Sequence, residues 1–320
     1  MTTTRECTWT AAHHARADGQ TRGRRIVVTG ATGTIGRRVA RLLIADHDVW
    51  SLNRDPQRAA RSGTAGRHIG VDLSDRPAVK EALAGADALL VITFDPVEPR
   101  HDRNLVEAAQ AAGIAHVVKV SALAVTDPGS DDLVTRWQRE CEALWCASGL
   151  APTLLRPRVY MSNCLGWAPS IRAGGSVDVL DGTSPNACVD PSDVAAAAAA
   201  VLREPVPHAG RAYALTGPQP LTAREQVEVL ADTLQQSLRI RYLTPTQAME
   251  NWRARYPEPL AQALLERAER QRSGVKATVE EGVRTLTGRA PGAFRAWAER
   301  HATYFRTTPA APADVQRDRG

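Results

Sequence analysis

Three glycines at three-residue spacing constrain this chain more than any other feature. Gly30, Gly33 and Gly36 lie in VVTGATGTIGRR (residues 27–38), directly after an apolar run that is typical of a β-strand. The apolar residues from Ile35 to Leu43 then recur at helical spacing. A glycine-rich turn between a strand and a helix lets the backbone approach a pyrophosphate, and the helix N-terminus favours negative charge. The motif therefore predicts a dinucleotide site, although a tight turn without a ligand would have the same spacing. The residues of this turn expected to contact the nucleotide are Gly30, Thr32, Gly33, Thr34, Ile35, Gly36 and Arg37.

Strand and helix patterns alternate after the turn. The run ADALLVITF (86–94) is fully apolar, as in a central strand of a parallel sheet that is buried on both faces. The alternation predicts right-handed βαβ units and an α/β fold, a doubly wound parallel Rossmann sheet with a smaller, mostly helical C-terminal substrate region. The expected boundaries are a disordered extension over 1–23, a core over 24–157 to which 187–217 return, a substrate or lid region over 158–186 and 218–305, and a disordered tail over 306–320.

The end of the second predicted strand bears on which dinucleotide is bound. An NAD site usually has an acidic residue there, which binds the ribose 2′-hydroxyl. In this chain Asn53 carries no repulsive charge, and Arg54, assisted by Arg37, is placed to pair with a 2′-phosphate. Arg54 is alternatively a solvated loop charge, and the acidic Asp55 beside it leaves NAD as an alternative cofactor. We expect NADP (NADPH).

Other strand ends complete the predicted nucleotide site. Asp72, with Leu73, ends the third strand, where its carboxylate either accepts from the adenine amino group or forms an Asx turn. Thr93 and Phe94 end the central strand and should lie beside the middle of the cofactor, because ligands of such sheets bind at the carboxyl ends of the strands.

Composition excludes several classes of function. The 320 residues carry a formal charge of +5, but arginines are interspersed with acidic residues, which favours a solvated surface over a nucleic-acid site. There is no apolar run of membrane-spanning length and no signal-peptide core, so we expect a cytoplasmic protein without a membrane partner. The five cysteines form no CxxC pair, and no histidine lies at zinc-ligand spacing, so no metal site is predicted. The oligomeric state stays open.

Several segments together resemble a known family. GATGTIGR, LNRDP, VDLSD and VVKVSA are similar to an atypical short-chain dehydrogenase/reductase of the NmrA-like type. The similarity continues through residues 135–163, 210–234 and 287–305. The resemblance implies a Rossmann core, a smaller C-terminal substrate region and NADP as the cofactor.

The catalytic signature of the wider superfamily is absent. Its Tyr and the Lys four residues later would align with Val134 and Gln138, and no other tyrosine has a Lys at that spacing. Hydride transfer itself needs only a positioned acceptor and the exclusion of water. The candidate catalytic hydroxyls are Ser121 and Tyr160, and the candidate substrate-binding residues are Tyr160 and Asn163.

Two hypotheses of function follow. The first is an NADPH-dependent oxidoreductase that transfers hydride to a quinone, an enone or another carbonyl-type small molecule, possibly in a biosynthetic pathway. The second is a non-catalytic NADP(H)-sensing regulatory protein that binds a protein partner, because Val134 and Gln138 replace the acid–base pair.

Three further residues have an alternative structural role. Lys119 lies in mid-strand on the same face as Ser121, and we expect only the strand end to reach the site. Trp137 and Trp145 are eight residues apart, which indicates helix packing against the sheet rather than stacking on a substrate.

Overall fold

A parallel sheet forms the centre of the molecule. The computed structural model describes residues 23–180 and 182–306, so the expected disordered segments 1–23 and 306–320 lie outside it except for their innermost residues. In these described ranges the main sheet has seven strands in the order β3-β2-β1-β4-β5-β6-β8, and every neighbouring pair is parallel. The first six follow the order of a doubly wound dinucleotide-binding sheet, so the predicted fold class is confirmed. The strands are β1 (Arg25–Val28), β2 (Asp48–Asn53), β3 (Arg67–Gly70), β4 (Ala88–Val91), β5 (His116–Val120), β6 (Thr153–Pro157) and β8 (Ala212–Leu215).

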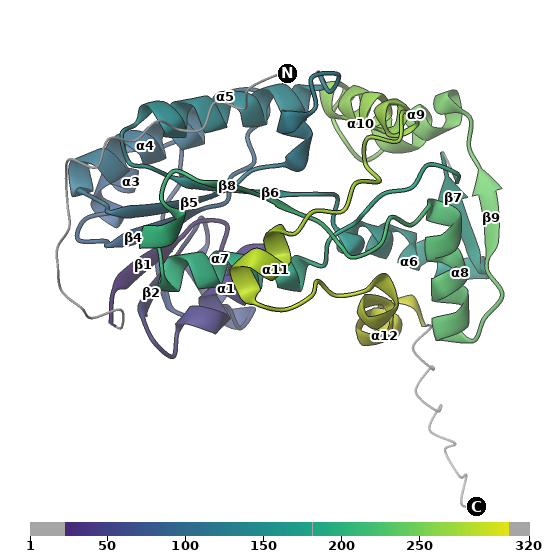
Figure 1. Cartoon of the computed structure of the whole chain (residues 1–320), viewed down its shortest axis with the longest axis horizontal. Helices are drawn as coiled ribbons and strands as arrows, with labels where there is room; N and C mark the ends of the chain where they lie inside the picture. The colour runs from purple at the N-terminus through teal and green to yellow at the C-terminus, as the bar shows by residue number, and fades with distance from the viewer. Residues whose placement is uncertain (1–22, 181, 307–320) are drawn as a thin grey trace, which may run out of the picture.

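Helices cover both faces of this sheet (Figure 1). Side chains alternate between the two faces, so Ile26 and Val28 of β1 enter one hydrophobic cluster while Val27 enters the other. The first cluster lies under α1 (Thr34–Leu43), α7 (Pro191–Arg203) and α11 (Gly282–Thr287). The second lies under α3 (Arg76–Ala82), α4 (Arg100–Ala112) and α5 (Leu133–Ala147), while α2 (Pro56–Arg61) packs against β2 and β3.

The C-terminal part forms a second, smaller layer beside the carboxyl ends of the strands (Figure 1). Its own hydrophobic cluster includes Met161, Ile171, Leu230 and Trp297. The region is mostly helical, as predicted, but a short parallel pair of strands, β7 and β9, was not expected. Its elements are η2 (Met161–Trp167), α6 (Ala168–Gly174), β7 (Ser176–Val179), α8 (Ala223–Leu234), β9 (Arg239–Tyr242), α9 (Pro245–Arg253), α10 (Glu258–Gln271) and α12 (Phe294–Phe305).

A paired carboxylate and guanidinium tie this layer to the core. The short helix η1 (Leu123–Thr126) follows β5 and leads into Asp127, whose two oxygens accept from Arg270 of α10 at 2.6 and 2.7 Å.

The remaining short helix is η3 (Val206–His208), which precedes β8. Within the described residues, no helix has the length and apolar character needed to cross a bilayer.

Candidate active site

The glycine turn is shaped by steric contacts that exclude side chains. Gly30 has φ +58°, and a Cβ there would lie 2.9 Å from the Ile92 carbonyl oxygen. A Cβ on Gly36 would lie 2.4 Å from the carbonyl oxygen of Gly30, so this glycine lets α1 start directly against the turn. Helix α1 begins after Gly33 without a side-chain cap, which leaves its first N–H groups free to bind an anion. The glycine turn and the start of α1 together therefore fit a pyrophosphate.

A groove of about 350 Å³, here called the outer groove, extends from this turn across the ends of β2, β3 and β4. Arg54 has an exposed side chain and, among the described residues, no ion pair. The neighbouring Asp55 does not line the groove, because its carboxylate caps α2 by accepting from the Arg58 N–H at 2.8 Å. The sequence left NAD open on account of Asp55, and this carboxylate is committed to the helix. The outer groove is lined by Gly30, Thr32, Leu52, Asn53, Arg54, Val71, Asp72, Leu73, Ser74, Ile92, Thr93, Phe94 and His101.

Asp72 forms the Asx turn, which is one of the two roles that its sequence context allows. One carboxylate oxygen accepts from the Ser74 N–H at 2.9 Å, which makes the Asx turn. This hydrogen bond, and more weakly the positive charges of His101 and Arg54, lower the pKa of Asp72 below its usual value. The side chain is exposed and lines the outer groove.

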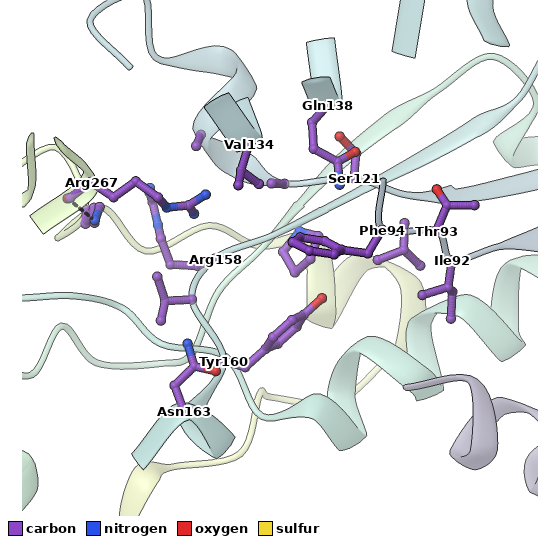
Figure 2. Close-up of a pocket in the computed structure, with 16 residues that line it drawn as sticks. Ile92, Thr93, Phe94, Ser121, Val134, Gln138, Arg158, Tyr160, Asn163 and Arg267 are labelled. Atoms are coloured by element: carbon purple, nitrogen blue, oxygen red, sulfur yellow. Dashed lines mark hydrogen bonds between the residues drawn. The ribbon is translucent and has the colours of Figure 1, made fainter. Parts of the chain in front are cut away.

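A second cavity of about 380 Å³, here called the inner cavity, adjoins the outer groove. Both spaces are lined by the same three consecutive residues, Ile92, Thr93 and Phe94, at the end of β4. Figure 2 shows these residues on one side of the inner cavity, with Tyr160 pointing into it from below. The other lining residues are Val120, Ser121, Ala122, Ala124, Val134, Gln138, Pro157, Arg158, Val159, Tyr160, Asn163, Arg267 and Lys276.

Several polar atoms of the inner cavity have no partner within the protein. Ser121 Oγ, Gln138 Oε1 and Arg158 Nε are buried without a hydrogen bond in the described structure. Burial raises the pKa of Tyr160, so the phenol stays protonated and able to donate over the whole physiological range. Buried polar groups normally find partners, so these atoms indicate a polar ligand in the cavity.

Lys119 lies beneath this site in a buried ion pair. Its Nζ is 2.8 Å from Asp102 Oδ1 in α4, and both side chains are fully buried. Burial alone would raise the pKa of Asp102, but the charge of Lys119 and the hydrogen bonds from Lys119, Thr93 and Trp145 outweigh it and hold the pKa below its usual value. Lys119 does not line either space, as we expected from its mid-strand position.

The side chain of Thr93 is hydrogen-bonded to both members of this ion pair. Its hydroxyl donates to Asp102 Oδ2 at 2.6 Å and accepts from Lys119 Nζ at 2.8 Å. Thr93, which we expected beside the middle of the cofactor, lines the groove, but its hydroxyl is bonded within the protein. Trp145 donates to Asp102 Oδ1 at 2.8 Å, and Trp137 packs edge-on against Phe94 with 5.6 Å between ring centroids. Both tryptophans thus have packing roles.

Comparison with known proteins places this geometry in a family. Residues 30–205 match the model of a family described as NAD(P)H-binding. The chain belongs to this NAD(P)H-binding family. This match confirms the resemblance predicted from the sequence. The relatives include an NmrA-like family domain-containing oxidoreductase of Aspergillus flavus, 25% identical over 288 residues, which is 83% of this chain and 91% of the relative.

More similar relatives are reductases. A (4-alkanoyl-5-oxo-2,5-dihydrofuran-3-yl)methyl phosphate reductase of Streptomyces griseus is 46% identical over 280 residues, which is 88% of this chain and 99% of the relative. An NAD(P)H azoreductase of Xenophilus azovorans is 32% identical, over 88% of this chain and 99% of the relative. The structure of an NADPH-dependent quinone oxidoreductase of Escherichia coli in complex with NADPH has a TM-score of 0.76 at 26% identity and covers 86% of this chain and 99% of that one. These relatives confirm that this NAD(P)H-binding chain is an oxidoreductase.

The structure brings most of the expected site residues to the two spaces. Gly33, Thr34, Ile35, Gly36 and Arg37 do not line the outer groove; the side chain of Ile35 is in the core, and only its backbone faces the turn. Sequence reasoning missed the three cations of the inner cavity, which are Arg158, Arg267 and Lys276. The one signal for Lys276 was the scarcity of lysine, which occurs only at positions 80, 119 and 276. In the described ranges, no group of three or more His, Cys, Asp or Glu side chains is placed to hold a metal ion.

Proposed function

We propose that this member of the NAD(P)H-binding family uses NADPH to reduce an α,β-unsaturated carbonyl compound held in the inner cavity. The observation that carries the proposal is that Ile92, Thr93 and Phe94 line both spaces. A dinucleotide whose adenine end lies near Arg54 and whose pyrophosphate lies on the glycine turn would reach this shared wall with its nicotinamide. When bound, the reduced nicotinamide supplies a hydride.

The inner cavity has the groups that such an acceptor needs. Tyr160 and Ser121 each present a hydroxyl to hydrogen-bond the carbonyl oxygen, on which negative charge develops when the β-carbon receives a hydride. Asn163 adds an amide donor at the same cavity. Gln138, in the position of the missing lysine, has an unpaired amide oxygen that would accept a hydrogen bond from a donor group of a bound ligand. The proton that completes the reduction comes from Tyr160, Ser121 or water.

The relative from Streptomyces griseus suggests a narrower substrate class. Its name describes an unsaturated five-membered lactone with an acyl group and a phosphate ester. The ring double bond of that compound is conjugated with two carbonyl groups, which makes its β-carbon a good hydride acceptor. We propose an acyl-substituted unsaturated lactone of this kind as the acceptor, with quinones as simpler substitutes.

Steady-state oxidation of NADPH and NADH in the presence of a benzoquinone and an acyl-substituted unsaturated lactone tests the function. We expect turnover with NADPH. Arg54→Ala should raise the KM for NADPH about tenfold or more and leave the KM for NADH nearly unchanged, because only the former carries the 2′-phosphate. The control is Arg58→Ala, an exposed arginine that does not line the groove. A protein inert toward every acceptor, yet with different affinities for NADP+ and NADPH, would instead favour the sensor hypothesis.

A further inference from the structure

Three cations from separate segments meet in the inner cavity. Arg158 follows β6, Arg267 lies in α10, and Lys276 lies in the loop after α10. Figure 2 shows Arg158 and Arg267 on the side of the cavity opposite Ile92 and Thr93, which form the wall shared with the outer groove. No Asp or Glu is among the described residues that line the cavity.

The surrounding carboxylates leave most of this charge without a partner. Asp132 Oδ1 lies 3.7 Å from Arg267 Nη1, but the same oxygen also accepts from the N–H groups of Val134 and Thr135 at the start of α5. Asp127 is held by Arg270. The charges of Glu280 and Asp127 act on Arg158, but Arg158 has no ion pair with any described residue, and its Nε is buried without a hydrogen bond.

Lys276 is also able to bind a ligand. Its Nζ donates to the Arg267 carbonyl oxygen at 2.7 Å and to Gln271 Oε1 at 3.4 Å, which leaves one of its three hydrogens. Burial, followed by the like charges of Arg267 and Arg158, lowers the pKa of Lys276 to about 8. An anion between the three side chains would relieve this repulsion.

We propose that this end of the inner cavity binds the phosphate monoester of the substrate through Arg158, Arg267 and Lys276. A phosphate monoester is a dianion at neutral pH and has three terminal oxygens. It can therefore pair with two guanidinium groups and an ammonium group at once, which a ligand with a single carboxylate could not do as well. The phosphates of the nucleotide belong to the outer groove, which none of the three cations lines. The inference rests on the proposed function, because it assigns one end of that substrate.

Kinetics with a matched pair of acceptors tests the phosphate subsite. The pair is an acyl-substituted unsaturated lactone with a phosphomethyl group and the same compound with a hydroxymethyl group. We expect the wild-type protein to prefer the phosphate by at least tenfold in kcat/KM, and Arg158→Met to reduce this preference about tenfold or more. Such a change equals the loss of about 1.4 kcal/mol of binding free energy. The control, Arg255→Met, removes an exposed arginine outside the cavity and should leave the preference unchanged.

The pH dependence of the wild-type protein gives a second measurement that needs no variant. The groups that act on Lys276 are Arg267, Arg158, Asp132 and Cys188, and the Cys188 thiol, with a pKa of about 11 caused by burial, stays neutral up to pH 9. Above pH 8 the loss of the Lys276 charge should lower kcat/KM for the phosphomethyl compound more than for the hydroxymethyl compound.

The outcomes separate the two proposals. Equal use of both lactones at all pH values, or an equal loss for both in Arg158→Met, would overturn the phosphate subsite while leaving the reductase function intact. If no acceptor is reduced, calorimetry with the phosphomethyl compound and the NADP+ complex still decides the subsite: tighter binding than for the hydroxymethyl compound supports it, and equal binding overturns it.

Discussion

The hydroxyl of Tyr160 has no hydrogen-bond partner among the described residues, although the ring packs against the core. Local sequence was enough to place this residue and Ser121 at the cavity, because each follows the end of a strand, and strand ends locate the ligand sites of a parallel sheet. Arg267 and Lys276 were not predictable in this way. They come from a distant helix and loop, and only tertiary packing brings them to the cavity.

Replacing Tyr160 by Phe should lower kcat for the lactone about tenfold or more with little change in KM for NADPH. The reason is that a hydrogen bond to the developing oxyanion acts mainly in the transition state. Tyr213→Phe is the matched control, because the Tyr213 hydroxyl is bonded to His208 at 2.8 Å and does not line the cavity. An unchanged kcat in Tyr160→Phe would assign the role to Ser121 or water.

At the scale of elements, strands that are buried on both faces were predicted well. Every residue of β4 is buried, and its continuous apolar sequence indicates this directly. The pair β7 and β9 was missed because each has four residues with polar side chains among them, and β9 is mostly exposed. Such a short pair is stabilised by the contact of β7 with α6 and by packing in the C-terminal hydrophobic cluster, which no local pattern reveals.

The junction of β1 and α1 gives a prediction at this scale. Gly36→Ala would place a methyl group 2.4 Å from the Gly30 carbonyl oxygen, so the turn must shift away from α1. We expect the Kd for NADPH, measured by calorimetry, to rise at least about tenfold, since the turn and the helix N-terminus bind the pyrophosphate together. Gly166→Ala, where an added Cβ meets no atom within 4 Å, should leave the Kd unchanged. A normal Kd in Gly36→Ala would show that the turn tolerates the shift.

At the scale of the whole molecule, Asp127 and Arg270 connect the Rossmann core to the C-terminal layer. The division into a core and a mostly helical region was predictable from the strand–helix alternation. The contact between them was not, because its two residues are separated by 143 positions. The same holds for Lys119 and Asp102, whose pairing across β5 and α4 needs the folded arrangement.

Hydrogen bonds from Arg270, and secondarily from Ser130, lower the pKa of Asp127 to about 2. The folded state therefore releases this proton at a lower pH than the unfolded state, and the stabilisation is complete above about pH 4 and lost as the pH falls toward 2. Asp127→Asn should be less stable than the wild type at pH 7, and the two should converge near pH 2. Urea unfolding at several pH values measures this. If the free energies of unfolding of the wild type and Asp127→Asn differed by the same amount at every pH, this prediction would be wrong. Asp131→Asn, with an exposed carboxylate, is the control.

The outer groove and the inner cavity are lined by different parts of the chain. All residues of the outer groove come from positions 30 to 101, whereas the inner cavity takes residues from positions 92 to 276. Under the proposed function, changes beyond position 101 would alter which compound is reduced while leaving affinity for the coenzyme intact. The relatives of this chain are named for a furanone phosphate, an azo compound and a quinone, a variety of acceptors that such a division would allow.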